Sequence, residues 1–171
     1  IAAAEAMEKY KIIPKGVSKK VKRKAKINVD RILNIESKVK HDVIAFLTSI
    51  NEKVGNEARF LHQGMTSSDV LDTCFNIQLK QSGEILIEDL NILINSIKKK
   101  AIKHKYTLCI GRSHGIHAEP TTFGLKLLTF YQEFKRNKKR LENAIEEIST
   151  CAISGAVGTF ANIDPRVESY V

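Results

Sequence analysis

Hydrophobic residues recur at helical spacing along two long stretches of this chain. In the first stretch, from Val70 to Ala101, the late apolar positions follow each other at steps of three or four residues, and no proline interrupts the pattern. The second stretch runs from Phe123 to Ile148. Such spacing is typical of helices buried along one seam against neighbouring helices. We therefore predict two rod-like helices, the first of about 35 residues or roughly 50 Å.

Shorter helices are predicted before these rods. Residues 1 to 12 have the pattern of a helix that Pro14 and Gly16 would end, since both residues continue a helix poorly. The basic run that follows predicts a second short helix, and Asn28 is a good N-cap for a third. An apolar helical pattern then continues to Gly55, interrupted only by a polar triplet at residues 40 to 42.

The ends of the long helices carry local signals. Thr66, Ser67 and Ser68 all favour helix N-caps, and Asp69 stands at the capping-box distance from Thr66. The stretch 111–124, GRSHGIHAEPTTFG, predicts a compact turn, with the second rod starting at Pro120 because proline suits a first helical position. The stretch 154–165, SGAVGTFANIDP, is Gly-rich and predicts an irregular loop that must pack closely against another segment.

These elements predict an all-α protein with two domains. Residues 1–65 would form an N-terminal helical domain with a truncated start, and residues 66–171 the first, incomplete part of a central bundle of long helices. Two rods joined by a turn leave apolar seams that need further partners. We expect those partners to come from chain outside this sequence, from other subunits, or from both.

Composition narrows the class of protein. The chain has 171 residues with 43% hydrophobic residues, which is typical of a globular protein. We expect a fragment, because neither Ile1 nor Val171 resembles a natural terminus. No signal peptide or membrane span is found in the sequence, and three scattered cysteines without a CxxC favour a reducing compartment, so we predict a cytoplasmic protein.

The net charge of +9 is concentrated at the start of the chain, where residues 1–40 hold twelve Lys/Arg against four Asp/Glu. A nucleic-acid-binding module is one interpretation of this basic excess. No aromatic residue is interleaved with the basic run to stack on a base. We therefore favour a solvated helix face over a nucleic-acid partner.

Four of the five histidines lie in three polar clusters, at residues 40–42, 62–69 and 111–117. A helix that starts with Thr66 and Ser67 offers free backbone N–H groups to a carboxylate or phosphate. Nearby histidines can transfer protons near neutral pH. This combination indicates a lyase, hydrolase or isomerase that acts on an anionic metabolite.

Metal binding and nucleophilic catalysis are the competing uses of these residues. His114 and His117 are three residues apart with Glu119 nearby, but they precede Pro120 and need not share a helix face, so we expect no metal. Ser113 has no identified base partner, which argues against a nucleophilic serine.

The same segments closely resemble the adenylosuccinate lyase family of the fumarase/aspartase superfamily. The matching stretches are KHDVIAF, HQGMTSSDVLDT, GRSHGIHAEPTTFG and SGAVGTFANI, in that order, and they extend over nearly the whole chain. Other lyases of the superfamily share variants of two of these motifs and are the nearest alternative. The HDV segment and the residues of the second motif favour the adenylosuccinate lyase family over these other lyases.

The resemblance implies a cofactor-independent β-elimination that cleaves adenylosuccinate to AMP and fumarate, and the succinyl-carboxamide ribotide to its carboxamide and fumarate. It implies that His114 is the general acid and that Thr66 and Ser67 hold a succinyl carboxylate. Ser113 stands where the family usually has Thr, and Lys40 where another residue is often found. The resemblance also implies a homotetramer with shared active sites, and a general base on a serine loop beyond residue 171, so that this fragment alone would be inactive. The remaining residues that it places in the site are Lys40, His41 and Asp42 on the nucleotide side and His62 close to the phosphate.

Overall fold

The computed structural model describes residues 1–171 and is predominantly helical, which confirms the predicted all-α class with the addition of one small hairpin. The chain divides into two compact units. Unit 1 consists of Ile1–Cys74 and Cys151–Val171, and unit 2 of Phe75–Thr150. The division into domains at residues 65 and 66 is not decided by these units and stays a prediction.

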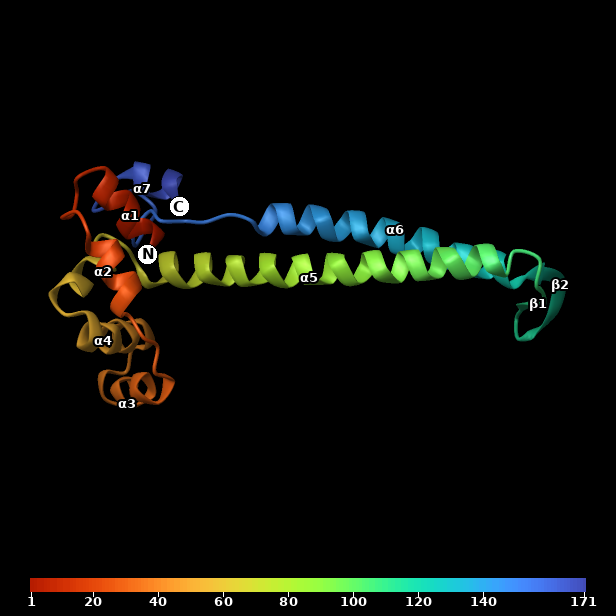
Figure 1. The fold of residues 1–171 in the computed structure, drawn as a ribbon, viewed down its shortest axis with the longest axis horizontal. Helices are drawn as coiled ribbons and strands as arrows, with labels where there is room; N and C mark the ends of the chain where they lie inside the picture. The colour runs from red at the N-terminus through yellow and green to blue at the C-terminus, as the bar shows by residue number, and fades with distance from the viewer. The chain divides into compact units, whose positions relative to one another are not determined.

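Unit 1 is built from short helices (Figure 1). Asn28 caps the third helix as predicted, because its Oδ1 accepts a hydrogen bond from the backbone N–H of Arg31 at 2.9 Å. The first helix ends at Lys9, before Pro14, and Gly16 instead stands at the N-cap of the second helix with φ 97°. The elements of unit 1 are α1 (Ala2–Lys9), α2 (Val17–Lys24), α3 (Val29–Val39), α4 (Asp42–Val54), the 3-10 helix η1 (Asn56–Phe60), the first turns of α5 (Ser67–Lys103) and α7 (Pro165–Tyr170).

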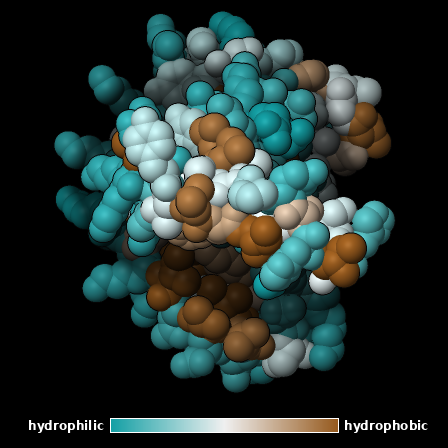
Figure 2. All heavy atoms as spheres, turned by 90° about the vertical axis from the view of Figure 1, so that its right-hand side faces the viewer, coloured by the Kyte–Doolittle hydropathy of each residue, from teal (hydrophilic) through white to brown (hydrophobic).

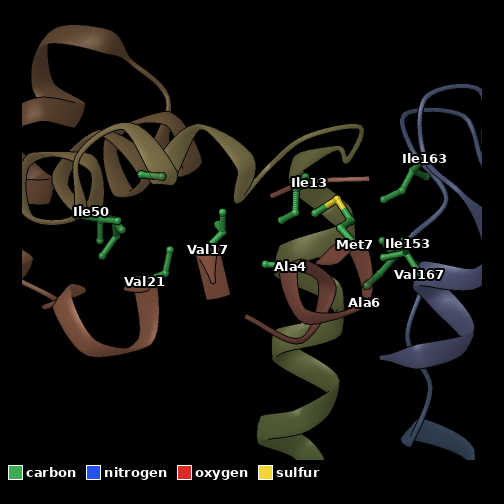
Figure 3. Close-up of a cluster of buried hydrophobic side chains, with 12 residues drawn as sticks. Ala4, Ala6, Met7, Ile13, Val17, Val21, Ile50, Ile153, Ile163 and Val167 are labelled. Atoms are coloured by element: carbon green, nitrogen blue, oxygen red, sulfur yellow. The ribbon is translucent and has the colours of Figure 1, made fainter. Parts of the chain in front are cut away.

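The hydrophobic core of unit 1 joins residues from both ends of the chain. Met7 and Val167 are among its most deeply buried side chains, and α1 contacts both α2 and α7. Figure 3 shows Ala6 and Met7 of α1 close to Ile153 and Val167. The C-terminal segment is thus part of the same core as the first helix.

Glu8 ties α1 to the start of α2. Its carboxylate accepts hydrogen bonds from the backbone N–H of Gly16 at 3.0 Å and of Ser18 at 2.5 Å. Burial raises the pKa of the Glu8 carboxyl, but the two backbone N–H donors, the Ser18 side chain and the charge of Lys15 together lower it by more, so its pKa lies below the ordinary value of 4.5. The carboxylate supplies a helix cap from another helix, because Gly16 has no side chain to do so.

Unit 2 contains the rest of α5, the strands β1 (Leu108–Ser113) and β2 (Ile116–Thr122), and α6 (Phe123–Ile148). Both predicted rods are confirmed, and α5 continues without a break for 37 residues. Within unit 2 the helices run antiparallel, since Gly83 lies against Ile145 and Gly124 lies against Ala101 and Lys105. Every helix of the chain is too short or too polar to span a membrane.

The predicted start of the second rod at Pro120 is wrong. Pro120 lies in β2, where it pairs with Ile110, and α6 begins only at Phe123. The Thr122 hydroxyl accepts a hydrogen bond from the N–H of Leu125 at 3.2 Å and so provides the N-cap. A proline is tolerated here because each strand of a two-stranded sheet has a free edge that needs no N–H donor.

Large apolar side chains of unit 2 remain exposed to solvent. Leu108 is 79% exposed and Ile116 is 68% exposed, and both belong to the hairpin. Figure 2 looks on to the end of the molecule that carries the hairpin and shows hydrophobic residues lying among hydrophilic ones at the surface. Exposed apolar residues are also found along α5 and α6, as the predicted need for further partners implies.

Replacing Glu8 with Gln is expected to lower the free energy of unfolding by about 1 kcal/mol at neutral pH, since the charged acceptor of two N–H groups is lost. The lowered pKa means that this stabilisation is present above pH 4.5 and is lost as the pH falls through the folded-state pKa. Thermal unfolding of the full-length protein as a function of pH measures both effects. Glu36→Gln is the control, because Glu36 is half-buried in α3 without a side-chain hydrogen bond. Equal losses in the two variants, or a loss that persists in acid, would contradict the capping role.

Replacing Gly124 with Ala is expected to cost about 1–3 kcal/mol or more, because overpacking here meets backbone rather than flexible side chains. A Cβ at position 124 would lie 2.5 Å from the Ala101 carbonyl oxygen and 2.7 Å from Lys105 Cα. Gly83→Ala is the matched control, since its Cβ would meet the Ile145 side chain rather than backbone, with Cγ1 at 2.6 Å and Cδ1 at 2.8 Å. The control also gains about 1 kcal/mol of helix propensity. In thermal melts the Tm of Gly124→Ala should lie well below that of Gly83→Ala. The reverse order would show that the start of α6 can move away from α5.

Candidate functional site

The turn at the tip of the hairpin consists of His114 and Gly115. Ser113 pairs with Ile116, so only these two residues connect the strands. Both have positive φ, 51° for His114 and 77° for Gly115, which is the requirement of a type I′ turn. His is one of the few residues other than glycine that adopts this conformation with some frequency. The backbone therefore holds the exposed imidazole of His114 at a defined position between two strands.

A β-bulge lies next to this turn. The register shifts between Ile110 and Arg112, so that Gly111 alone faces two residues of β2. A Cβ at Gly111 would lie 2.7 Å from the carbonyl oxygen of Glu119, which explains why glycine occupies the position. Bulges bend a strand and redirect the side chains that follow. The bulged strand here is β2, where Ala118 and Glu119 lie opposite the single residue Gly111.

The triplet of Lys40, His41 and Asp42 forms the junction between α3 and α4. Lys40 ends α3 in the left-handed conformation, with φ 55°. His41 is the N-cap of α4, because its Nδ1 accepts a hydrogen bond from the N–H of Ile44 at 3.4 Å. All three side chains are exposed. The Asp42 carboxylate accepts a hydrogen bond from the backbone N–H of Val43 at 2.7 Å.

Helix α5 starts at Ser67, as its sequence predicts. The backbone N–H of Thr66 donates to Asp69 Oδ2 at 2.9 Å, which is one half of a capping box. The hydroxyls of Thr66 and Ser67 make no hydrogen bond within the protein, and both residues are half-buried. The first N–H groups of a helix also lack intrahelical acceptors. This helix start therefore presents hydroxyl and N–H donors suited to an anion.

Asp69 also binds the loop that follows residue 153. Its Oδ1 accepts from the N–H of Ser154 at 3.3 Å, and its Oδ2 accepts from the N–H of Gly155 at 3.0 Å. A Cβ at Gly64 would lie 2.2 Å from the carbonyl oxygen of Asn162, so the segment before α5 packs directly on this loop. The prediction that residues 154–165 form an irregular, closely packed loop is confirmed.

His62 lies in the turn between η1 and α5. Its Nε2 is buried and has no hydrogen-bond partner in the structure. Buried polar atoms are nearly always paired, so an unpaired one requires an explanation, such as a role in binding. The atom belongs to the same short segment as the free hydroxyls of Thr66 and Ser67.

The structure thus brings together some of the predicted residues. In unit 1, His62, Thr66 and Ser67 share one segment packed on the loop 154–163, whereas residues 40–42 form a separate helix junction. In unit 2, Ser113 and His114 lie side by side at the hairpin turn. Sequence reasoning missed the second role of Asp69, because capping-box spacing already explained that residue. No cluster of three or more His, Cys, Asp or Glu side chains is positioned to hold a metal ion.

Comparison with solved structures identifies the fold. A fumarate lyase from Mesorhizobium sp. BNC1 matches the fold with a TM-score of 0.91 at 24% identity, over 99% of this chain and 41% of that structure. The β-carboxy-cis,cis-muconate cycloisomerase from Acinetobacter calcoaceticus sp. ADP1 matches with a TM-score of 0.84 at 25% identity, over 94% of this chain and 39% of its own. The fold is therefore that of the helical domains of fumarate lyases.

The family follows from sequence comparison. The model of the family described as Lyase matches residues 1–171, and the chain belongs to this family. It is 48% identical over 171 residues to the adenylosuccinate lyase of Bacillus subtilis (strain 168), covering 100% of this chain and 40% of that enzyme. It is 50% identical over 169 residues to the adenylosuccinate lyase of Synechocystis sp. (strain ATCC 27184 / PCC 6803 / Kazusa), covering 99% of this chain and 39% of that enzyme. The chain thus spans about two fifths of these curated relatives.

Replacing Gly115 with Ala is expected to weaken the hairpin by about 1–2 kcal/mol, the cost of placing a residue with a Cβ in the left-handed region. No atom lies within 4 Å of the Cβ position, so the cost comes from the backbone alone. Gly115→Asn is the matched control, because Asn adopts this conformation more readily. Hydrogen exchange of the hairpin amides, followed by mass spectrometry in the full-length protein, should be faster in Gly115→Ala and nearly unchanged in Gly115→Asn. Equal exchange in the two variants would argue against the type I′ turn.

Proposed function

We propose that the full-length protein that carries this chain is an adenylosuccinate lyase. It would cleave adenylosuccinate to AMP and fumarate, and the succinyl-carboxamide ribotide to its carboxamide and fumarate. The observation that carries this proposal is the identity of 48% and 50% to two curated adenylosuccinate lyases across essentially the whole chain. The four motifs that resemble this family all lie within the aligned region.

The proposed reaction is a β-elimination that breaks the bond between the succinyl carbon and the purine-side nitrogen. A base removes a proton from the neighbouring carbon, and the electron pair of that C–H bond becomes the double bond of fumarate as the C–N bond breaks. The departing nitrogen takes up a proton from a general acid. We assign this role to His114, which is exposed and held in place by the backbone of a two-residue turn.

Binding of a succinyl carboxylate is assigned to Thr66 and Ser67. Two hydroxyls without internal partners and the N-terminus of a 37-residue helix support this assignment. The partial positive charge at a helix N-terminus stabilises an anion. It would also stabilise the negative charge that develops on the carboxylate during proton removal.

The nucleotide side is assigned to Lys40, His41 and Asp42, and the phosphate to the neighbourhood of His62. The exposed Lys40 supplies a positive charge, and the unpaired Nε2 of His62 supplies a donor or acceptor according to its tautomer. Ser113 directly precedes the proposed general acid, and it keeps the hydroxyl of the Thr that the family usually has at this position. The reaction needs no cofactor or metal, since proton transfers and charge stabilisation are sufficient for it.

The proposal extends to the whole protein. A homotetramer with shared active sites, a cytoplasmic location, and helical domains at residues 1–65 and 66–171 belong to it. The exposed apolar side chains of α5 and α6 support association with further helices. Neither a membrane nor a nucleic acid is a partner in this proposal.

Another lyase of the same superfamily is the alternative, since two related folds carry other names. Assaying the full-length protein with adenylosuccinate and argininosuccinate in parallel separates these activities. The nucleic-acid alternative predicts steeply salt-dependent RNA binding. One of the basic residues concerned, Lys20, is already paired with Glu57, which reduces the charge available to a polyanion.

Replacing His114 with Asn in the full-length protein is expected to lower kcat/KM for adenylosuccinate by about 10²- to 10⁴-fold, the range for loss of a general acid. Asn keeps the left-handed backbone of the turn and removes only the imidazole. The measurement is the absorbance change on fumarate release.

His117→Asn is the matched control, because His117 is an exposed histidine of the same hairpin outside the turn. It should retain near-normal turnover. Wild-type rates in the His114→Asn variant would remove His114 as the general acid, and a wild-type protein that releases no fumarate from adenylosuccinate would refute the proposed function.

A further inference from the structure

Asp69 is a buried carboxylate, 6% exposed, at the third position of α5. It accepts hydrogen bonds from three backbone N–H groups, those of Thr66, Ser154 and Gly155. We propose that Asp69 is a positioning residue that holds Thr66 and Ser67 in the orientation needed to bind the substrate carboxylate. This inference rests on the proposed function.

A helix cap alone does not account for this arrangement. The capping box requires one carboxylate oxygen to accept from the N–H of the N-cap residue. Asp69 does this with Oδ2, but the same oxygen also accepts from Gly155, and Oδ1 accepts from Ser154. The side chain therefore fixes the helix start to a loop 85 residues further along the chain.

The other half of the capping box is missing. In a complete box the hydroxyl of the N-cap residue accepts from the N–H of the residue three positions later. Here the Thr66 hydroxyl makes no hydrogen bond within the protein, and Asp69 holds the Thr66 backbone instead. The hydroxyl is thereby left free for a ligand while its backbone is immobilised.

The charge of Asp69 is compatible with an anion bound nearby. A buried carboxylate is tolerated when hydrogen bonds stabilise its charged form. Three N–H donors point at its two oxygens and offset its negative charge. Close packing supports the same geometry, since Gly64 lies against Asn162 and the Cβ position of Gly155 lies 3.5 Å from the Gly64 carbonyl oxygen.

The test replaces Asp69 with Asn in the full-length protein. Asn has nearly the same shape, but its NH₂ group is a donor and would face backbone N–H groups that are also donors. We expect the Kd for fumarate, measured by calorimetry, to rise by about tenfold or more. The KM for adenylosuccinate should rise with it, because Thr66 and Ser67 would no longer be held in place.

Glu168→Gln is the matched control. Glu168 Oε2 accepts from the N–H of Ile153 at 2.8 Å, so it also anchors the start of this loop, but it makes no bond to α5. This variant should lower the Tm while the Kd for fumarate stays at the wild-type value. A purely structural role for Asp69 would give the same result in both variants, and that outcome would overturn the inference.

Asp69→Glu tests the inference if the Asn variant does not fold. It keeps the charge and the acceptors but moves them by one methylene, so its Kd for fumarate should lie above the wild-type value. A wild-type Kd together with a lowered Tm would overturn the inference. A wild-type protein that neither cleaves adenylosuccinate nor binds fumarate refutes the proposed function itself, whereas normal wild-type turnover with an unchanged Kd in the variants refutes the inference alone.

Discussion

Hydrogen bonds between side chains near the start of α5 and the backbone after residue 150 are the constraint on which unit 1 depends. Asp69 binds the N–H groups of Ser154 and Gly155, and Thr73 Oγ1 accepts from the N–H of Ala152 at 3.4 Å. The segment 150–165 has almost no regular structure, so its backbone groups lack the partners that a helix or sheet supplies. Buried side chains provide these partners, and Ile153 and Ile163 are thereby placed in the core.

The two segments of unit 1 are separated in the sequence by unit 2, Phe75–Thr150, so unit 1 forms only when these segments meet. Closing a flexible loop of this length costs about 4 kcal/mol in entropy. The antiparallel pair of α5 and α6 reduces this cost, because it brings the ends of unit 2 together, where Asn76 Nδ2 donates to the Thr150 carbonyl oxygen at 2.9 Å. We therefore expect local helices to form before unit 1 closes.

Helical elements followed from the sequence because their signals are local. The cap at Asn28, the start at Ser67 and the two long rods each rest on neighbouring residues and on periodic spacing. The sequence does not predict the hairpin, because a hairpin depends on the pairing of two stretches. Leu108 pairs with Thr122, and no property of either stretch alone indicates the other. The sequence predicts a compact turn, but the pairing that places Pro120 in a strand depends on two consecutive residues with positive φ.

The candidate site shows the same limit. Sequence motifs predict His62, Thr66, Ser67 and His114 as candidate site residues, but the environment of each depends on distant residues that no motif includes. Asp69 is an example, because its spacing from Thr66 fully explains a cap and conceals its contacts to Ser154 and Gly155. The Thr66 hydroxyl and His62 Nε2 have no hydrogen-bond partner within the protein. Only the three-dimensional structure shows this, because it requires the positions of all neighbouring groups.

The position of His114 depends on the base of the hairpin as much as on its tip. An isolated two-stranded hairpin is only marginally stable in water, and most side chains of this one are exposed. Its anchoring comes from the base, where Phe123 N donates to the Thr107 carbonyl oxygen at 2.8 Å and Gly124 N donates to that of His104 at 3.0 Å. Gly124 allows this contact because α6 starts too close to the end of α5 for any Cβ. A glycine at the base of the hairpin thus helps to determine where the imidazole at its tip is held.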